Sequence, residues 1–99
     1  MNDLDYLQLA LDEAIAAGQA GEVPVGAVIV YQDAVLVQAQ NRVLRDNDPT
    51  AHAEVVALRA AGRALGNHRL NGCTMFVTLE PCSMCAGALV HARLDRCFR

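Results

Sequence analysis

The strongest strand signal in the chain lies at residues 25–40, Val25-Gly26-Ala27-Val28-Ile29-Val30-Tyr31-Gln32-Asp33-Ala34-Val35-Leu36-Val37-Gln38-Ala39-Gln40. Residues 25–31 are nearly all apolar and rich in β-branched side chains, as expected of a strand that is buried on both faces. Residues 34–40 alternate in part between apolar and polar side chains, which also indicates a strand. Only Gln32 and Asp33 separate the two runs, so the segment predicts an antiparallel hairpin.

Helices are predicted before and after this hairpin. Residues 3–17 carry apolar side chains at helical spacing and stop before Gly18, a common C-terminal signal. Those apolar positions are Leu4, Leu7, Leu11 and Ile15. After a polar loop at 41–50, Thr50 is expected to be the N-cap of a second helix that runs to about Leu65. The residues expected on its inner side are Val55, Leu58 and Leu65.

The rest of the chain continues to alternate between strands and helices. Residues 73–78 indicate a third, buried strand, and residues 95–99 indicate the beginning of a fourth. Between them, Pro81 opens an uncharged helix that runs to about Ala92, and its composition predicts packing on most sides. The two crossovers after the hairpin predict that the later strands are parallel. This order of elements predicts a layered α/β sandwich formed by one domain, residues 1–99.

Composition places the chain among ordinary globular proteins, because it is 54% hydrophobic and 19% charged. It has no run of eighteen apolar residues, and the acidic segment Met1-Asn2-Asp3-Leu4-Asp5 is unlike a secretory signal, so we expect no membrane segment and a cytoplasmic location. The net charge is −3, yet all eight basic residues are arginine, the side chain best suited to phosphate. Charge alone therefore does not choose between nucleic acid and other partners.

Two short motifs carry the chemistry, His52-Ala53-Glu54 and Pro81-Cys82-Ser83-Met84-Cys85. One imidazole and two thiolates supply three ligands for a zinc ion, which leaves a coordination position open, as in catalytic rather than structural zinc sites. Glu54 is not a ligand and would act as the proton carrier. The pattern H-x-E…P-C-x-x-C is typical of zinc-dependent nucleobase deaminases.

Helix geometry explains how these residues reach one ion. Cys82 and Cys85 are three residues apart at the start of a helix, so they share a face, and the positive helix N-terminus favours their thiolates. His52 and Glu54 would point about 200° apart in mid-helix, given 3.6 residues per turn. Both address one cavity only at a helix end. The two helices are expected to begin at the same sheet edge, where α/β folds bind their substrates.

Other interpretations of the same residues stay open. A cytoplasmic C-x-x-C motif also occurs in redox sites and in structural zinc knuckles. A structural site would need a fourth protein ligand, and the candidates are Cys73, Cys97, His68 and His91. Cys73 and Cys97 lie in apolar runs and are better explained as buried thiols. His68 is expected to be a loop residue, and His91 to complement the C-terminal end of its helix.

The motifs extend beyond the metal signature. They are Glu22-Val23-Pro24-Val25-Gly26-Ala27-Val28, Asn41-Arg42, Asp48-Pro49-Thr50-Ala51-His52-Ala53-Glu54, Thr78-Leu79-Glu80-Pro81-Cys82-Ser83-Met84-Cys85-Ala86-Gly87-Ala88 and His91-Ala92-Arg93-Leu94. Over nearly the whole chain this set resembles the bacterial tRNA-specific adenosine deaminases of the zinc-dependent cytidine and deoxycytidylate deaminase superfamily. The resemblance implies a three-layer α/β/α sandwich of the cytidine-deaminase-like type with a mixed sheet.

The same resemblance implies a function and a set of roles. The reaction would be the conversion of adenosine to inosine at the wobble position of a tRNA anticodon, in a homodimer with one zinc per subunit. His52, Cys82 and Cys85 would be the zinc ligands, Glu54 the proton shuttle, and Asn41 a hydrogen-bond partner of the target base. An anticodon loop is already partly unstacked, so its bases are cheap to extrude. Arginines such as Arg42 and Arg45 could contact its phosphates without reading the sequence.

Spacing alone does not select adenine, because the same zinc signature serves deaminases of free cytosine, guanine or a nucleotide. A structural zinc module or an inactive fragment is the non-enzyme alternative. Family members also continue through further strands and a C-terminal helix that helps to hold the tRNA. The resemblance therefore predicts that a chain ending at residue 99 lacks those strands and that helix, exposes an apolar sheet edge, and is poorly soluble and inactive on its own.

Overall fold

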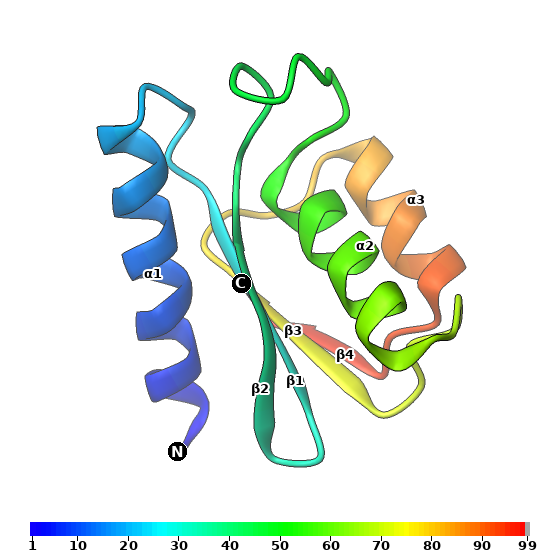
Figure 1. The fold of residues 1–99 in the computed structure, drawn as a ribbon. Coiled ribbons are helices and arrows are strands. Elements are labelled where there is room, and N and C mark those ends of the chain that lie inside the picture. The colour runs from blue at the N-terminus through cyan, green and yellow to red at the C-terminus, as the bar shows by residue number, and fades with distance from the viewer. Residues whose placement is uncertain (99) are drawn as a thin grey trace.

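A computed structural model describes residues 1–98 and shows three layers (Figure 1). The elements are α1 (Asp3–Gln19), β1 (Gly26–Tyr31), β2 (Ala34–Gln40), α2 (Ala53–Leu65), β3 (Cys73–Val77), α3 (Ser83–Ala92) and β4 (Arg96–Phe98). Helix α1 covers one face of the sheet, and α2 and α3 cover the other. The predicted three-layer α/β/α sandwich is confirmed. Arg99, the last residue of the predicted fourth strand, lies outside the described residues. None of the described helices has the length and apolar character needed to cross a membrane.

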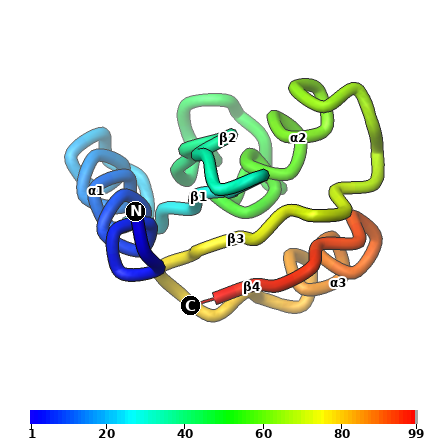
Figure 2. Tube along the Cα trace, turned by 90° about the horizontal axis from the view of Figure 1, so that it is seen from below, coloured from blue at the N-terminus to red at the C-terminus, as the bar shows by residue number. Residues whose placement is uncertain are grey.

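The sheet has the strand order β2-β1-β3-β4 and is mixed. Strands β1 and β2 form the predicted antiparallel hairpin, and both turn residues, Gln32 and Asp33, have positive φ angles of 51° and 61°. Such turns match the twist of the flanking strands. Strand β3 returns to the free edge of β1 and pairs with it antiparallel, while β3 and β4 are parallel. The later strands are thus parallel to each other, as predicted, but not to their neighbour β1 (Figure 2).

Alternation along β1 builds a core on each side of the sheet. Ala27 and Ile29 belong to the cluster beneath α2, whereas Val28 and Val30 belong to the cluster beneath α1. Phe76 joins the α1 cluster from β3, and its ring lies 5.2 Å from the rings of both Tyr6 and Phe98. Because β1 is covered on both faces and paired on both edges, it is the central element that orients the two helical layers.

Helix α1 packs on the sheet mainly through small residues, with Leu7 of the four apolar positions partly buried beside them. Leu4, Leu11 and Ile15 are 74%, 46% and 52% exposed. The buried residues are Tyr6, Ala10, Ala14 and Ala17. The small alanines allow the helix backbone to approach the sheet so closely that a Cβ at Gly26 would lie 2.0 Å from the carbonyl oxygen of Ala10. A leucine stripe would not permit that distance.

Two expectations for α2 and α3 also need correction. The inner face of α2 consists of Ala53, Ala57 and Ala61, with Leu58 and Leu65 packed beside them, whereas Val55 is only half-buried. Helix α3 is not packed on most sides: Cys85 and Ala92 are buried, but Met84 and Val90 are 39% and 75% exposed. Within residues 1–98, α3 has only one covered face, because its single helical neighbour is α2.

The close approach of α1 to β1 gives a stability prediction. Replacing Gly26 with Ala places a methyl group against the backbone of Ala10 and Ala14, so we expect the free energy of unfolding to fall by about 2–4 kcal/mol. The matched control is Gly87→Ala in α3, where a Cβ meets no atom within 4 Å, and stability should rise by up to about 1 kcal/mol. Urea denaturation of both variants of the complete gene product measures this difference, and equal stabilities would contradict the packing described here.

Candidate metal centre

Three potential metal ligands lie at the beginnings of α2 and α3. His52 is the N-cap of α2 and Cys82 is the N-cap of α3, both with extended backbone, and Cys85 lies in the first turn of α3. The two helices begin at the same end of the molecule (Figure 1). His52, Cys82 and Cys85 therefore lie at helix starts, as predicted. Because both helices begin at the same end of the molecule, the three residues also lie at one edge of the sheet.

The geometry of this group fits a zinc ion. The Nδ1 atom of His52 lies 3.6 Å from Sγ of Cys82 and 3.5 Å from Sγ of Cys85. All three ligand atoms lie within 4.8 Å of one another. With bonds of about 2.0–2.3 Å, a tetrahedral zinc ion separates its nitrogen and sulfur ligands by roughly 3.6 Å. One imidazole and two thiols are also ligands that zinc prefers.

The helix starts differ by a few residues from those predicted. Helix α2 begins after His52, not after Thr50, and the Thr50 hydroxyl instead donates to Oδ1 of Asp48 at 2.7 Å. Helix α3 begins at Ser83, so Pro81 precedes the helix instead of opening it. As a result, His52 and Cys82 are themselves the N-cap residues of the two helices, and both have extended rather than helical backbone.

Glu54 lies beside the ligand group in a small pocket. Its carboxylate is in the first turn of α2 and the residue is 4% exposed. The pocket has a volume of about 250 Å³. Its lining residues are Val23, Val25, Asn41, His52, Glu54, Leu79, Glu80 and Cys82. The structure therefore brings two of the predicted ligands, His52 and Cys82, to one cavity with the predicted proton carrier and the predicted base contact, while the third ligand, Cys85, lies 3.5 Å from His52.

The two thiols differ in acidity. A hydrogen bond from the backbone N–H of Cys85, aided by that of Met84, lowers the pKa of Cys82 despite some burial and the nearby charge of Glu54. Burial first, and then the charge of Glu54, raise the pKa of Cys85 to about 12. Metal binding requires both thiolates, so it must release a proton from Cys85 and is favoured by rising pH.

The candidates for a fourth protein ligand lie elsewhere. Cys73 is buried in β3, where burial raises the pKa of its thiol, and Cys97 is half-buried in β4. His68 and His91 are exposed. Among the described residues, His52, Cys82 and Cys85 are the only group of three or more potential ligands close enough to share an ion. A three-residue ligand set is therefore favoured over a Cys₃His or Cys₂His₂ site.

Asn41 follows β2 and is held by backbone contacts. Its N–H donates to the carbonyl of Val25 at 3.1 Å, and its side-chain Oδ1 accepts from the N–H of Val43 at 3.0 Å. The residue is 6% exposed. Because Oδ1 is engaged by the loop, the NH₂ group is the part of this side chain suited to meet a ligand in the pocket.

Residue patterns alone gave no role to two ion pairs beside this pocket. Glu22, 5% exposed, accepts hydrogen bonds from the backbone N–H groups of Leu44 and Arg45 and from the Arg45 side chain. Burial acts against its charge, but these bonds outweigh burial and lower its pKa. Asp48 binds Thr50 and Arg59. In the sequence, Glu22 cannot be distinguished from a solvated loop carboxylate. Its partners, Leu44 and Arg45, are more than twenty residues away and are seen only in the folded structure.

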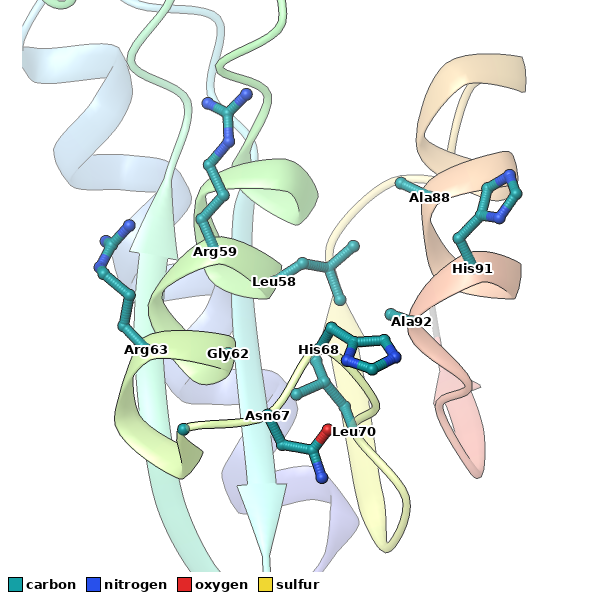
Figure 3. A pocket seen from close by; sticks show the side chains of 11 residues that line it. Leu58, Arg59, Gly62, Arg63, Asn67, His68, Leu70, Ala88, His91 and Ala92 are labelled. Atoms are coloured by element: carbon teal, nitrogen blue, oxygen red, sulfur yellow. The ribbon is translucent and has the colours of Figure 1, made fainter.

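A second hollow lies away from the ligand group, between α2 and α3 (Figure 3). Its volume is about 950 Å³. Leu58 points from α2 toward Ala88 and Ala92 on α3, and His68 of the connecting loop lies between the two helices. Neither His52, Glu54 nor either metal-binding cysteine lines it. Size alone therefore does not locate the chemistry in this molecule.

The fold and the ligand group define a zinc-dependent deaminase domain. Residues 1–99 match the cytidine and deoxycytidylate deaminase zinc-binding region, and the chain belongs to this family.

Within this family, the chain is similar to deaminases that act on purines. The chain is 46% identical over 94 residues to the tRNA-specific adenosine deaminase of Buchnera aphidicola subsp. Schizaphis graminum, covering 95% of this chain and 62% of that protein. It is 45% identical over 101 residues to the guanine deaminase of Bacillus subtilis, covering 99% of this chain and 64% of that protein. The chain thus spans about three fifths of the length of these relatives.

Solved structures show the same two likenesses. A chain from a structural study of A-to-I editing by tRNA:A34 deaminases superposes with a TM-score of 0.93 at 48% identity, covering 95% of this chain and 68% of that one. The X-ray structure of Bacillus subtilis guanine deaminase superposes with a TM-score of 0.96 at 43% identity, covering 99% of this chain and 63% of that one. The fold is shared by deaminases of different purines, so it does not choose the substrate.

The ligand group predicts the outcome of cysteine substitutions. Removing a ligand thiol with Cys82→Ala or Cys85→Ala should reduce bound zinc from about one ion per chain to near zero, because two ligands hold zinc far more weakly than three. Cys73→Ala is the matched control and should retain zinc. Metal analysis of the purified proteins measures this, and zinc loss in the Cys73 variant would instead favour a structural site with four ligands.

The Asp48 ion pair predicts a pH effect. Hydrogen bonds from Thr50, followed by the contact with Arg59, lower the pKa of Asp48 from 3.8 to about 2. A depressed pKa stabilises the fold above the unfolded value and loses that contribution as the pH falls from about 4 to about 2. Asp48→Asn should therefore be less stable than the parent at pH 7, with the difference shrinking toward pH 2. Denaturation at a series of pH values measures the difference, and a pH-independent gap would exclude this ionisation as its source.

Proposed function

We propose that the protein containing this chain hydrolytically deaminates adenosine to inosine at the wobble position of tRNA anticodons. The observation that carries the proposal is the convergence of His52, Cys82, Glu54 and Asn41 on one pocket. Relatives named tRNA-specific adenosine deaminase, at 44–48% identity, support the choice of substrate. Deamination replaces the exocyclic amine of the base with oxygen from water and releases ammonia.

In this proposal His52, Cys82 and Cys85 hold one zinc ion through Nδ1 and two thiolates. When bound, zinc supplies Lewis acidity, which makes water nucleophilic at neutral pH. Burial keeps the Cys85 sulfur away from bulk solvent, and the backbone N–H groups at the start of α3 stabilise the Cys82 thiolate. The protein thus contributes a preformed ligand triangle on two rigid helix ends.

Glu54 is proposed to transfer protons. Its carboxylate shares the pocket with His52 and Cys82, so it is placed to accept one proton from water and deliver it to a ring nitrogen, and then to carry the second water proton to the amine that leaves as ammonia. It reaches the pocket from the first turn of α2, while Ala53, Ala57 and Ala61 of the same helix belong to the core beneath it. A mobile surface carboxylate would be less well oriented for two successive transfers.

Asn41 is proposed to orient the base. With Oδ1 fixed by the N–H of Val43, its NH₂ group donates to an acceptor on the purine edge. The pocket, at about 250 Å³, is smaller than the roughly 300–1,000 Å³ of sites for drug-sized ligands. A single flat base fits such a space, while the sugar and phosphates stay outside.

The pocket mouth favours a base presented by a polymer. Val23 and Leu79 line the pocket yet are 60% and 55% exposed, so the mouth is apolar and accessible among the described residues. A flipped base can enter through such an opening while its neighbours remain outside. Arg42 pairs with Asp46 at the surface, and Arg45 is bound to Glu22, so a phosphate contact by either stays a prediction.

Guanine deamination is the second candidate, supported by the 45% identity and the TM-score of 0.96 to the Bacillus subtilis guanine deaminase and its structure. We further propose a homodimer, as the family resemblance implies, and a cytoplasmic location, where a reducing environment keeps these thiols free for metal. No disulfide joins any of the four cysteines, all of which lie in the described part of the chain.

Glu54→Gln tests the mechanism, because it removes the proton carrier and no ligand. With the complete gene product, we expect unchanged zinc content and a fall in turnover of about 10²–10⁴-fold. Inosine formation in tRNA measures activity, with ammonia release from guanine, cytosine and adenosine assayed in parallel. Near-normal turnover in the variant would refute the proton-transfer role. Release from guanine without inosine in tRNA would establish the second candidate instead.

A further inference from the structure

The loop that carries Asn41 is held by one buried carboxylate. Glu22 lies in the connection between α1 and β1, residues 20–25, and its side chain is 1% exposed. Oε1 accepts from the N–H of Leu44 at 3.0 Å, and Oε2 accepts from the N–H and Nε–H of Arg45, both at 2.9 Å. These are charge-assisted bonds, about twice as strong as neutral ones. Glu22 therefore binds the loop that follows β2 at two successive backbone positions.

Arg45 also binds the residues at which the loop begins. One of its terminal nitrogens donates to Oε1 of Gln40 at 2.8 Å and to the backbone carbonyl of Asn41 at 2.6 Å. The guanidinium group thus bridges Glu22, the end of β2 and Asn41 itself. A planar group with several donors can make all of these bonds at once, which an ammonium group cannot.

The same loop fixes the Asn41 side chain and the start of the ligand segment. Val43, whose N–H holds Oδ1 of Asn41, directly precedes the two residues bound by Glu22. The N–H of Arg42 donates to the carbonyl of Ala51 at 2.9 Å, next to His52. A displacement of residues 42–45 would rotate the Asn41 amide before it disturbed the zinc ligands on α2 and α3.

We propose that Glu22 is a positioning residue that, through Arg45 and residues 42–44, sets the orientation of the Asn41 amide in the substrate pocket. Glu22 does not line that pocket, so it acts on the substrate only through the loop. A carboxylate is required because three N–H groups converge on its two oxygens. Glutamine would turn an NH₂ group toward one or two of those donors. The role in catalysis rests on the proposed deaminase function, whereas the positioning of Asn41 does not.

A double-mutant cycle tests the catalytic consequence. It uses the zinc-loaded complete gene product and an anticodon stem-loop with adenosine at the wobble position. We expect Glu22→Gln to retain one zinc per chain and to lower kcat/KM about 10- to 100-fold. In combination with Asn41→Ala it should add little, within about threefold of Asn41→Ala alone. Multiplying effects in the double variant, or an unchanged kcat/KM in Glu22→Gln, would overturn the proposal. Asp46→Asn, which removes an exposed carboxylate paired with an arginine in the same loop, is the matched control and should stay within about threefold of the parent.

A second measurement needs no substrate. The side-chain NH₂ signal of Asn41, assigned in a ¹⁵N–¹H NMR spectrum by its loss in Asn41→Ala, reports the orientation of this amide. It should shift in Glu22→Gln and in Arg45→Lys, and remain in place in Asp46→Asn. An unmoved signal in Glu22→Gln refutes the positioning role, and if that variant does not fold, Arg45→Lys decides the question. Because this readout is independent of activity, failure of the deaminase proposal and failure of the positioning proposal are distinguishable.

Discussion

The site depends on one constraint, that α2 and α3 begin at the same end of the sheet. Each helix follows a strand of the same direction, since β3 runs parallel to β2 in space although β1 lies between them. Their N-termini therefore lie at the same end of the molecule, where His52, Cys82 and Cys85 converge. The N–H groups at the start of α3 lower the pKa of the Cys82 thiol, whereas burial and the charge of Glu54 raise that of Cys85, so the helix start favours one of the two thiolates and not both as predicted. The topology thus provides both the geometry and part of the electrostatics.

Buried carboxylates serve two different purposes around this centre. Glu54 shares the pocket with the metal ligands, where it can exchange protons with a substrate. Glu22 is equally buried but has three N–H partners, which keep it ionised and tie the loop after β2 to the preceding connection. A carboxylate with all its acceptors engaged stabilises structure, whereas one facing a cavity is available for chemistry. Burial alone would not distinguish the two.

Small side chains control how closely the layers pack. Alanines face the sheet from both α1 and α2, and Gly26 allows the backbone of α1 to approach β1 directly. The larger residues Leu4, Leu11 and Ile15 stay exposed on α1, as does Val90 on α3. Hydrophobic periodicity therefore identified the helices correctly, but it did not show which side chains of α1 are buried. The close approach of α1 to β1 at Gly26 favours alanine on the buried face.

The sequence by itself determined the local structure, namely the helices and the hairpin with its Gln32-Asp33 turn, and it identified His52, Cys82 and Cys85 beside Glu54 as candidates for the chemistry. These follow from short-range preferences and from donor types, which are properties of the residues themselves. Only the tertiary structure decided that β3 pairs antiparallel with β1, that His52 and not Thr50 caps α2, and that Glu22 and Arg45 hold the Asn41 loop. The strand pairing and the contact between Glu22 and Arg45 join segments far apart in the chain, and a carboxylate can accept from many donors until the fold brings particular ones near.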